Sequence, residues 1–261
     1  ISKLYKLKNK NILKNLKKWM LKAFTLIMIF LFFNCSSEKE TTTSEEIIVA
    51  PQENLFYLGA DLSYVNEMEN CGVVYKTKNG TTKDVFNIFS DEGANIVRVR
   101  KWHNPNWTSY SNFNDIEKTI SRAKNAKMKV LLDFHYSDDW ADPNKQVIPK
   151  AWLPVIDDVQ KLGNSIYNYT YKTLKKLAVK NLLPEIVQVG NETNIMILQK
   201  DDKSTAMDWS RNSYLLNKGI KAVRDISSKK NTKIEIMLHI AQPENGLWWF
   251  AEAKQNGVTD F

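Results

Sequence analysis

Residues 129–143 read KVLLDFHYSDDWADP, a short apolar run followed directly by a polar segment. A run of this length that is apolar on both faces predicts a strand of a parallel sheet whose two faces are both covered. The polar residues after it predict a loop at the carboxyl end of that strand. Further short runs of the same kind predict strands at residues 56–61, 95–100, 185–189 and 233–239.

The intervals between these runs carry helical patterns. Thr81 to Asp84 resemble a capping box that opens one helix, and Asn114 with Glu117 opens the next. Apolar spacing predicts the remaining helices at residues 164–180, 208–227 and 247–255. Strands and helices that alternate in this order predict an α/β domain with the (β/α)8 TIM-barrel fold.

The barrel that these elements predict is incomplete. The fifth strand and its helix are followed by residues 258–261, which resemble the entry to a sixth strand, and there the sequence ends. A complete barrel has about 250 residues, and an open sheet would leave a hydrophobic strand edge unpaired, which natural proteins avoid. We therefore expect residues 55–261 to be a partial catalytic barrel from a fragment or a truncated gene product.

Residues 1–54 predict export. Residues 1–34 hold eight lysines, which account for the whole formal net charge of +8, and the apolar run AFTLIMIFLFF at 23–33 is too short to span a bilayer. This is the pattern of a signal peptide, and residues 1–19 are interpreted as over-extended translation ahead of a start at Met20. The segment LFFNC resembles a bacterial lipobox, which implies a lipidated Cys35 and a polar tether over residues 35–54.

This N-terminal pattern limits the localisation and the partners. We expect an exported lipoprotein of the bacterial cell envelope, on the outer membrane or the cell surface, or otherwise a secreted protein. The lipid would be its sole attachment to a membrane. The rest of the chain is electrically neutral, so it offers no footprint for nucleic acid. Cys71, the other thiol, has no partner for a disulfide and is expected to be buried or half-buried.

Polar residues gather at the ends of the predicted strands. In a barrel of this kind the active site lies at the carboxyl ends of the strands. The candidate functional residues are therefore Asp61, Arg98, Arg100, Trp102, His103, Asp133, His135, Asp138, Trp140, Asn191, Glu192 and His239. Arg98 and Arg100 share one face of their strand. Facing inward they could hold a carboxylate ionised, whereas facing outward they would crowd the helix layer.

Glu192 follows IVQVG, a buried run that ends in a glycine turn. A carboxyl group at the rim of an enclosed pocket is partly desolvated, which raises its pKa and allows it to donate a proton near neutral pH. The alternative is structural, because Asn191 and Glu192 could simply cap the helix that follows. The dipeptide alone does not separate the two interpretations.

Four segments together resemble glycoside hydrolase family 53, the endo-β-1,4-galactanases: YLGADLS at 57–63, VRVRKW at 97–102, LDFHYSDDWADP at 132–143 and VQVGNE at 187–192. The resemblance runs from residue 56 to the end of the chain. It implies a retaining (β/α)8 glycosidase that cleaves β-1,4-galactan of type I arabinogalactan, with Glu192 as the acid/base and Asn191 in contact with the sugar 2-hydroxyl. The family places the nucleophile at the end of strand seven, so we expect the nucleophile to be missing and the chain as given to be inactive.

Other residues at the strand ends suit a sugar site. Indole rings stack on the C–H faces of sugars, and histidines could bind sugar hydroxyls or else tie down loops. The expected substrate contacts are Asp61, Trp102, His135, Asp138, Trp140 and His239, supported by Arg98 and Arg100. No metal or other cofactor is expected, with calcium confined to later loops, and the protein is expected to be a monomer.

Other functions remain open. Asp61, His103, His135, Asp138 and His239 could mark a metal-dependent barrel hydrolase, although the sequence has neither paired histidines on one strand nor an HExxH helix. The protein could also be a carbohydrate-binding lipoprotein without catalysis. A third alternative keeps the retaining glycosidase and changes its substrate to mannan, xylan or cellulose.

Overall fold

Parallel strands form the sheet of this protein, in the spatial order β1-β2-β3-β4-β5. The computed structural model describes residues 56–200 and 206–261, so the predicted signal peptide, Cys35 and the tether lie outside the described residues. The strands are β1 (Gly59–Asp61), β2 (Ile96–Lys101), β3 (Lys129–Phe134), β4 (Ile186–Val189) and β5 (Glu235–Met237). Each of them overlaps a predicted strand, so the strand predictions are confirmed.

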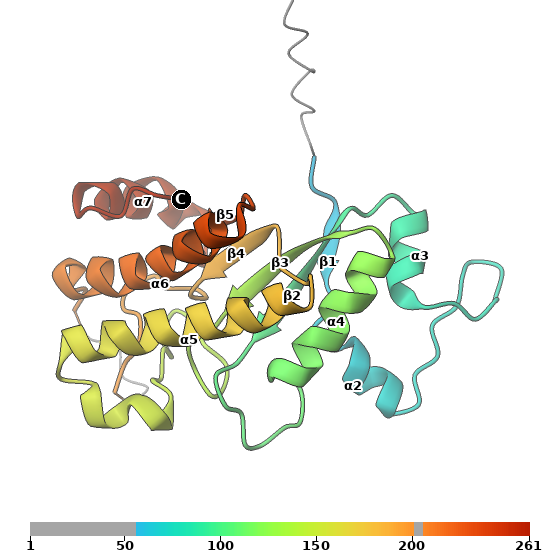
Figure 1. Cartoon of the computed structure of the whole chain (residues 1–261), viewed down its shortest axis with the longest axis horizontal. Helices are drawn as coiled ribbons and strands as arrows, with labels where there is room; N and C mark the ends of the chain where they lie inside the picture. Colours follow the sequence, from blue (N-terminus) through green and yellow to red (C-terminus); the bar gives the residue numbers. More distant parts are fainter. Residues whose placement is uncertain (1–55, 201–205) are drawn as a thin grey trace, which may run out of the picture. The chain divides into compact units, whose positions relative to one another are not determined.

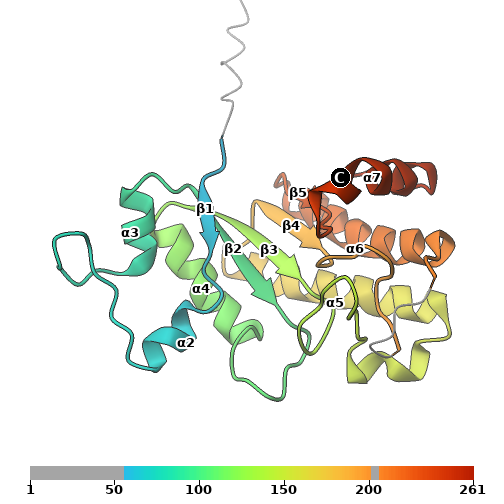
Figure 2. The ribbon, with the colours of Figure 1, turned by 180° about the vertical axis from the view of Figure 1, so that it is seen from behind.

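Helices connect the strands. They are α2 (Val65–Asn70), α3 (Val85–Asp91), α4 (Phe113–Asn125), α5 (Val159–Val179), α6 (Trp209–Lys230) and α7 (Gly246–Gln255), with the 3-10 helices η1 (Lys150–Val155) and η2 (Pro243–Asn245). Helices α4, α5 and α6 form a layer against one face of the sheet (Figures 1 and 2). This arrangement is that of consecutive βα units of a (β/α)8 barrel. No helix in the described part of the chain is long and apolar enough to cross a membrane.

The alternation of side chains along each strand gives the sheet two different faces. Val97 and Val99 on β2 and Leu132 on β3 are buried in the core with the helices. Arg98 on β2 and Asp133 on β3 alternate with them and therefore point to the opposite face. The apolar face holds the helix layer in place, and the polar residues of the other face are free to build a site.

The predicted starts of three helices are wrong, and the helix predicted from residue 164, α5, begins at Val159 after the N-cap Asp158. Helix α3 is capped by Asp84 rather than Thr81, because the Asp84 carboxylate accepts a hydrogen bond of 2.8 Å from the backbone N of the second helical residue. Helix α4 is capped by Asn112 rather than opened at Asn114, because the Asn112 side chain accepts a hydrogen bond of 3.1 Å from the third helical residue. Asp84 and Asn112 both have the non-helical backbone that an N-cap requires.

Two further expectations fail at the surface. Residues 258–261, predicted as the entry to a sixth strand, have no strand pairing in the described structure. Arg224 on α6 holds this segment instead, since its Nε and Nη2 lie 2.8 and 2.6 Å from the carboxylate oxygens of Asp260. Cys71 is exposed rather than buried or half-buried, because it follows the short surface helix α2 as its C-cap.

Candidate active site

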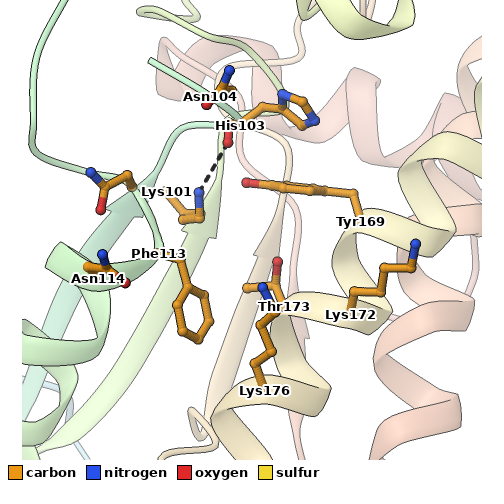
Figure 3. Close-up of a pocket in the computed structure, with 10 residues that line it drawn as sticks. Lys101, His103, Asn104, Phe113, Asn114, Tyr169, Lys172, Thr173 and Lys176 are labelled. Carbon is orange, nitrogen blue, oxygen red and sulfur yellow. Dashed lines mark hydrogen bonds between the residues drawn. The ribbon is translucent and has the colours of Figure 1, made fainter. Parts of the chain in front are cut away.

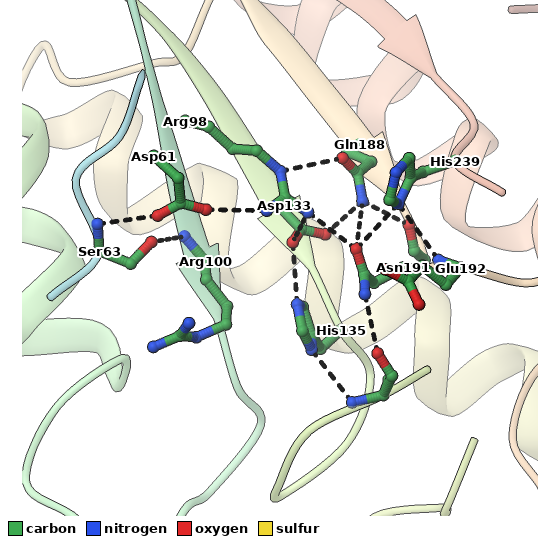
Figure 4. Close-up of polar contacts among 12 residues, drawn as sticks. Asp61, Ser63, Arg98, Arg100, Asp133, His135, Gln188, Asn191, Glu192 and His239 are labelled. Carbon is green, nitrogen blue, oxygen red and sulfur yellow. Dashed lines mark hydrogen bonds and ion pairs between the residues drawn. The ribbon is translucent and has the colours of Figure 1, made fainter. Parts of the chain in front are cut away.

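Arg98 on β2 is the centre of a polar network at the carboxyl ends of the strands (Figure 4). Its Nη1 donates to Asp61 Oδ2 on β1 at 2.8 Å, and its Nη2 lies 2.6 Å from Asp133 Oδ2 on β3. The same Nη2 donates to Oδ1 of Asn191, just after β4, at 2.8 Å. One guanidinium therefore positions groups that come from the ends of β1, β3 and β4.

Asp133 is the buried carboxylate of this network. Its Oδ2 is held by Arg98, and its Oδ1 accepts a hydrogen bond of 2.7 Å from Nε2 of Gln188. Nε2 of His135 lies 2.9 Å from Oδ2. A buried charge is stable only when it is paired and hydrogen-bonded, and these neighbours meet that condition. Because both oxygens are occupied by protein groups, Asp133 anchors the site rather than presenting a free carboxylate.

Asn191 is fixed by contacts of both its side-chain atoms. Its Nδ2 donates to the carbonyl oxygen of Ala141 at 2.8 Å, which turns its Oδ1 toward Arg98 and toward Nδ1 of His239, 2.9 Å away. Burial, and then the nearby charge of Arg98, lower the pKa of His239. The imidazole is therefore neutral near pH 7, and its Nδ1 lies between Oδ1 of Asn191 and the backbone N–H of Glu192, which is 3.3 Å away.

Glu192 lies in a turn with an unusual backbone. Its φ of 50° follows the φ of 84° of Gly190, and a residue with a side chain rarely adopts this left-handed conformation unless its surroundings hold it there. Gln146 supplies such a hold, because its Nε2 donates to the carbonyl oxygens of Asn191 and Glu192 at 2.7 and 3.2 Å. The direction of the Glu192 side chain therefore depends on a loop that is distant in the sequence.

The Glu192 carboxyl group is half-buried. Burial raises the pKa of Glu192, and the negative charge of Asp142 raises it further, while His135 and Arg98 oppose the change. The group therefore keeps its proton to a higher pH than an exposed glutamate does. A general acid needs this property in order to protonate a leaving group near neutral pH.

The interpretation of Asn191 and Glu192 as a helix cap is wrong. The next helix, α6, begins only at Trp209, and its N-cap is Asp208, whose carboxylate accepts a hydrogen bond from the backbone N of Arg211. Residues 190–198 are loop, with no helix among them. The two polar residues after β4 therefore have no capping role.

Arg100 is held apart from the carboxylates that Arg98 binds. Its guanidinium lies 4.6 Å from the ring centre of Tyr64 and 4.2 Å from those of Trp102 and Trp140. Its Nη2 donates to Oγ of Ser111 at 3.2 Å. Of the two arginines predicted to support the site, only Arg98 contacts carboxylates, and Arg100 stabilises an aromatic cluster beside it through cation–π contacts.

The two indoles expected to contact sugar have different surroundings. Trp140 is 40% exposed and presents an open ring, whereas Trp102 is only 1% exposed. The rings of Trp107 and Trp140 pack on Trp102 with centroid distances of 4.9 and 5.4 Å. Trp102 has no open face on which a sugar could stack, which differs from the expected direct contact, and it packs beneath the site instead.

Asp138 binds protein groups. Its Oδ1 accepts a hydrogen bond of 2.9 Å from the backbone N of Asn104 and lies 3.1 Å from Nδ1 of His103. Its Oδ2 accepts a hydrogen bond of 2.9 Å from the backbone N of Lys150. Although burial raises the pKa of Asp138, these hydrogen bonds lower it overall. Asp138 thus joins the loops that follow β2 and β3, which differs from the direct sugar contact expected of it.

The histidines lie in separate pairs with other side chains. His103 is paired with Asp138, and His239 with Asn191. His135 contacts Asp133, as described above. Among residues 56–200 and 206–261, no three His, Cys, Asp or Glu side chains come together in a group that could hold a metal ion. The residues behind the metal-hydrolase alternative are therefore dispersed.

Two glutamines of the site were not predicted. Gln188 stands within the apolar run of β4 and is 1% exposed, and a polar residue inside such a run was an available signal that it has a buried partner. Gln146 lies in the loop after β3, where no local pattern distinguishes it from its neighbours. Its role follows only from the folded path of the loop toward Glu192.

Comparisons with known proteins agree on one family. The profile of Glycosyl hydrolase family 53 matches residues 57–261. An arabinogalactan endo-β-1,4-galactanase from Cellvibrio japonicus is 57% identical over 208 residues, which are 79% of this chain and 55% of that protein. An endo-β-1,4-galactanase from Bacillus subtilis is 38% identical over 221 residues, which are 79% of this chain and 49% of that protein.

Solved structures agree with the fold. The structure of a fungal β-1,4-galactanase has 33% sequence identity and a TM-score of 0.70, covering 78% of this chain and 60% of that one. The catalytic domain of an Ignisphaera aggregans family 53 protein has 32% identity and a TM-score of 0.69, covering 78% and 57%. The predicted fold class is confirmed, and the chain spans about half the length of the curated relatives it matches. This chain belongs to glycosyl hydrolase family 53.

Proposed function

We propose that this chain is the acid/base-bearing part of a retaining endo-β-1,4-galactanase that cleaves the galactan of type I arabinogalactan. The observation that carries the proposal is the half-buried Glu192, which has a raised pKa and follows β4 next to the fixed Asn191. The relatives named as endo-β-1,4-galactanases support the choice of substrate.

The chemistry assigns two steps to Glu192. Its protonated carboxyl group donates a proton to the glycosidic oxygen, and its carboxylate then removes a proton from the water that releases the sugar. A retaining enzyme also needs a nucleophilic carboxylate about 5 Å from the acid/base. Asp133 is unsuited to that role because its oxygens are held by Arg98 and Gln188. We expect the nucleophile on a strand that follows β5 in the complete barrel.

The neighbours of Glu192 suit the binding of a sugar. Asn191 would contact the 2-hydroxyl, and His239 would form a hydrogen bond with a second hydroxyl through its Nε2. Trp140 offers an open indole face for stacking. Asp61 is one-third exposed along its side chain and lies at the same edge of the sheet, where it could bind a further hydroxyl.

The experiment uses the full-length protein and two substrates. Glu192→Ala is expected to slow the hydrolysis of β-1,4-galactan by about 10²- to 10⁴-fold. The first step on an aryl galactoside with an acidic leaving group should lose far less, because that leaving group needs no protonation. Glu235→Gln, which changes an exposed carboxylate on β5, is the control and should retain activity on both substrates.

Three results would count against the proposal. Equal losses on galactan and on the aryl galactoside would mean that Glu192 has a structural role and donates no proton. A wild-type protein that hydrolyses mannan, xylan or cellulose faster than galactan would keep the mechanism and replace the substrate. A protein that binds galactan without cleaving any of these glycans would support the alternative of a binding lipoprotein.

A further inference from the structure

A cavity of about 410 Å³ lies at the carboxyl end of β2, between that strand and helices α4 and α5 (Figure 3). Lys101 is the last residue of β2 and alternates with Arg100, so it points to the helix-covered face and away from the face that holds Arg98. The cavity is therefore separate from the site of Glu192. The residues that matter here are Lys101, His103, Asn112, Tyr169, Lys172 and Lys176.

The lining of this cavity is basic. Lys101, Lys172 and Lys176 all face it, and none of the three forms an ion pair with a carboxylate of the described residues. Lys176 lies 5.1 Å from the ring centre of Phe113, and Lys172 has neither a hydrogen-bond nor a ring partner in the same part of the chain. Asp138, which pairs with His103, is the carboxylate that acts on Lys101, so the lining of the cavity carries a net positive charge.

The amino end of α4 adds to this charge. Asn112, the N-cap of α4, and the first two helical residues line the cavity. The amino end of a helix of 13 residues carries a partial positive charge and backbone N–H groups without partners in the helix, and in α4 the carboxylate of Asp115 in the first turn offsets part of that charge. Ammonium groups and a helix amino end on one cavity form the usual surroundings of a bound anion.

Lys101 is the buried member of the group, with 2% of its surface exposed. Its Nζ donates to the backbone carbonyl oxygens of Trp102 and His103 and lies 5.4 Å from the ring centre of Tyr169. An ammonium has three N–H donors, so one donor is left over from these two acceptors. Burial lowers the pKa of Lys101 to about 7, with Asp138 opposing the change and Lys176 adding to it.

We propose that this cavity binds a small oxyanion, either phosphate or the carboxylate of an acidic sugar. The oxyanion would accept from the free N–H of Lys101 and pair with Lys172 and Lys176, with the amino end of α4 at its side. A volume of about 410 Å³ is large enough for a single phosphate or a single sugar ring. This site is independent of galactan cleavage.

The test titrates the full-length protein by calorimetry at constant ionic strength, with inorganic phosphate in one arm and galacturonate in the other. Saturable binding of either probe is expected, and the tighter probe identifies the source of the oxyanion. The double variant Lys172→Gln/Lys176→Gln should bind the probe at least about tenfold more weakly, because two charge-assisted contacts are lost. Lys175→Gln removes a charge from the same helix outside the cavity and should bind as the wild type does.

A second measurement isolates the buried lysine. Sulfate keeps one charge state between pH 6 and 8. Its binding should tighten by roughly tenfold when the pH is lowered from 8 to 6, because Lys101 becomes protonated. The other groups facing Lys101 are His103, Asp138, Tyr169 and Lys176. Lys101→Met removes the ammonium and leaves these groups in place, so it should bind sulfate weakly and with much less dependence on pH.

The proposal fails if neither phosphate nor galacturonate binds saturably in the millimolar range, or if Lys175→Gln weakens binding as much as the double variant does. It also fails if Lys101→Met binds sulfate as the wild type does. The double variant should cleave galactan at the wild-type rate, because neither lysine belongs to the site of Glu192. The outcome of this test is therefore distinguishable from the outcome of the Glu192 experiment.

Discussion

Arg98 connects residues from three strand ends, because its guanidinium contacts Asp61, Asp133 and Asn191. Arg98→Met would leave the fully buried Asp133 without its cation. Removing one partner of a buried ion pair costs about 3–5 kcal/mol. We expect a loss of this order in the free energy of unfolding, measured by urea denaturation of the full-length protein.

Two further variants show whether this loss comes from the buried charge. Arg98→Met/Asp133→Asn removes the orphaned carboxylate and should recover part of the lost stability. Lys78→Met breaks an ion pair with Glu92 that is exposed on both sides, and an exposed pair contributes about 0–1 kcal/mol. Equal losses for Arg98→Met and Lys78→Met would show that Asp133 does not depend on Arg98.

Asp142 is expected to extend activity to higher pH through its effect on the pKa of Glu192. Its negative charge favours the protonated form of Glu192 and so raises the pKa of Glu192, second only to burial. A general acid acts only while it is protonated, so activity falls as the pH rises through that pKa. Asp142→Asn should lower the pKa of Glu192 and move the alkaline limb of the kcat/KM profile to lower pH.

The matched control for this variant is Asp139→Asn. Asp139 lies in the same loop, but its carboxylate pairs with Lys145 at 2.9 Å and is not among the charges that act on Glu192. The alkaline limb of Asp139→Asn should stay where it is in the wild type. If both variants shift the limb equally, the effect belongs to the loop as a whole and not to the charge of Asp142.

Helix α6 packs tightly against β4 at Gly219. A Cβ atom placed there would lie 2.6 Å from Cγ1 of Val189 and 2.9 Å from the hydroxyl of Tyr136. An alanine in a helix normally stabilises it by about 1 kcal/mol relative to glycine. At Gly219 this gain is outweighed by overpacking, which costs about 1–3 kcal/mol.

Gly219→Ala should therefore lower the midpoint of thermal unfolding. Gly246→Ala, at the first position of α7 with no atom within 4 Å of its Cβ, should leave the midpoint unchanged or raise it slightly. A Gly219→Ala variant that is more stable than the wild type would mean that α6 does not pack on β4 as closely as these distances require.

The whole protein is proposed to reach the cell envelope as a lipoprotein through Cys35. A lipoprotein cysteine carries more than one acyl chain, and stable anchoring to a membrane needs two such signals. In the native host, Cys35→Ser should move the protein from the membrane fraction to the soluble fraction. The control Cys71→Ser removes the exposed thiol at the end of α2. It should leave the distribution of the protein between the membrane and soluble fractions unchanged. Equal membrane association of all three forms would refute the lipid anchor.

The order of the strands and of the helices from α3 to α7, and the residues at the strand ends, followed from the sequence alone, whereas the short helix α2 was not predicted. Short apolar runs and helical spacing are local patterns, and they placed all the described strands of the sheet correctly. The same patterns misplaced helix starts, because Thr81 and Asp84 are both able to cap within one turn. Local patterns also did not distinguish an active role of Asn191 and Glu192 from a helix-capping role.

The folded chain settled which of these residues act on one another. Arg98 reaches Gln188 and Asn191 across 90 and 93 positions of the sequence, and no local pattern encodes which of two arginines binds a carboxylate. The burial of Trp102, the hold of Gln146 on Glu192 and the basic cavity at Lys101 have the same origin. Each depends on segments that are distant in the chain and meet only when the sheet and its helices pack.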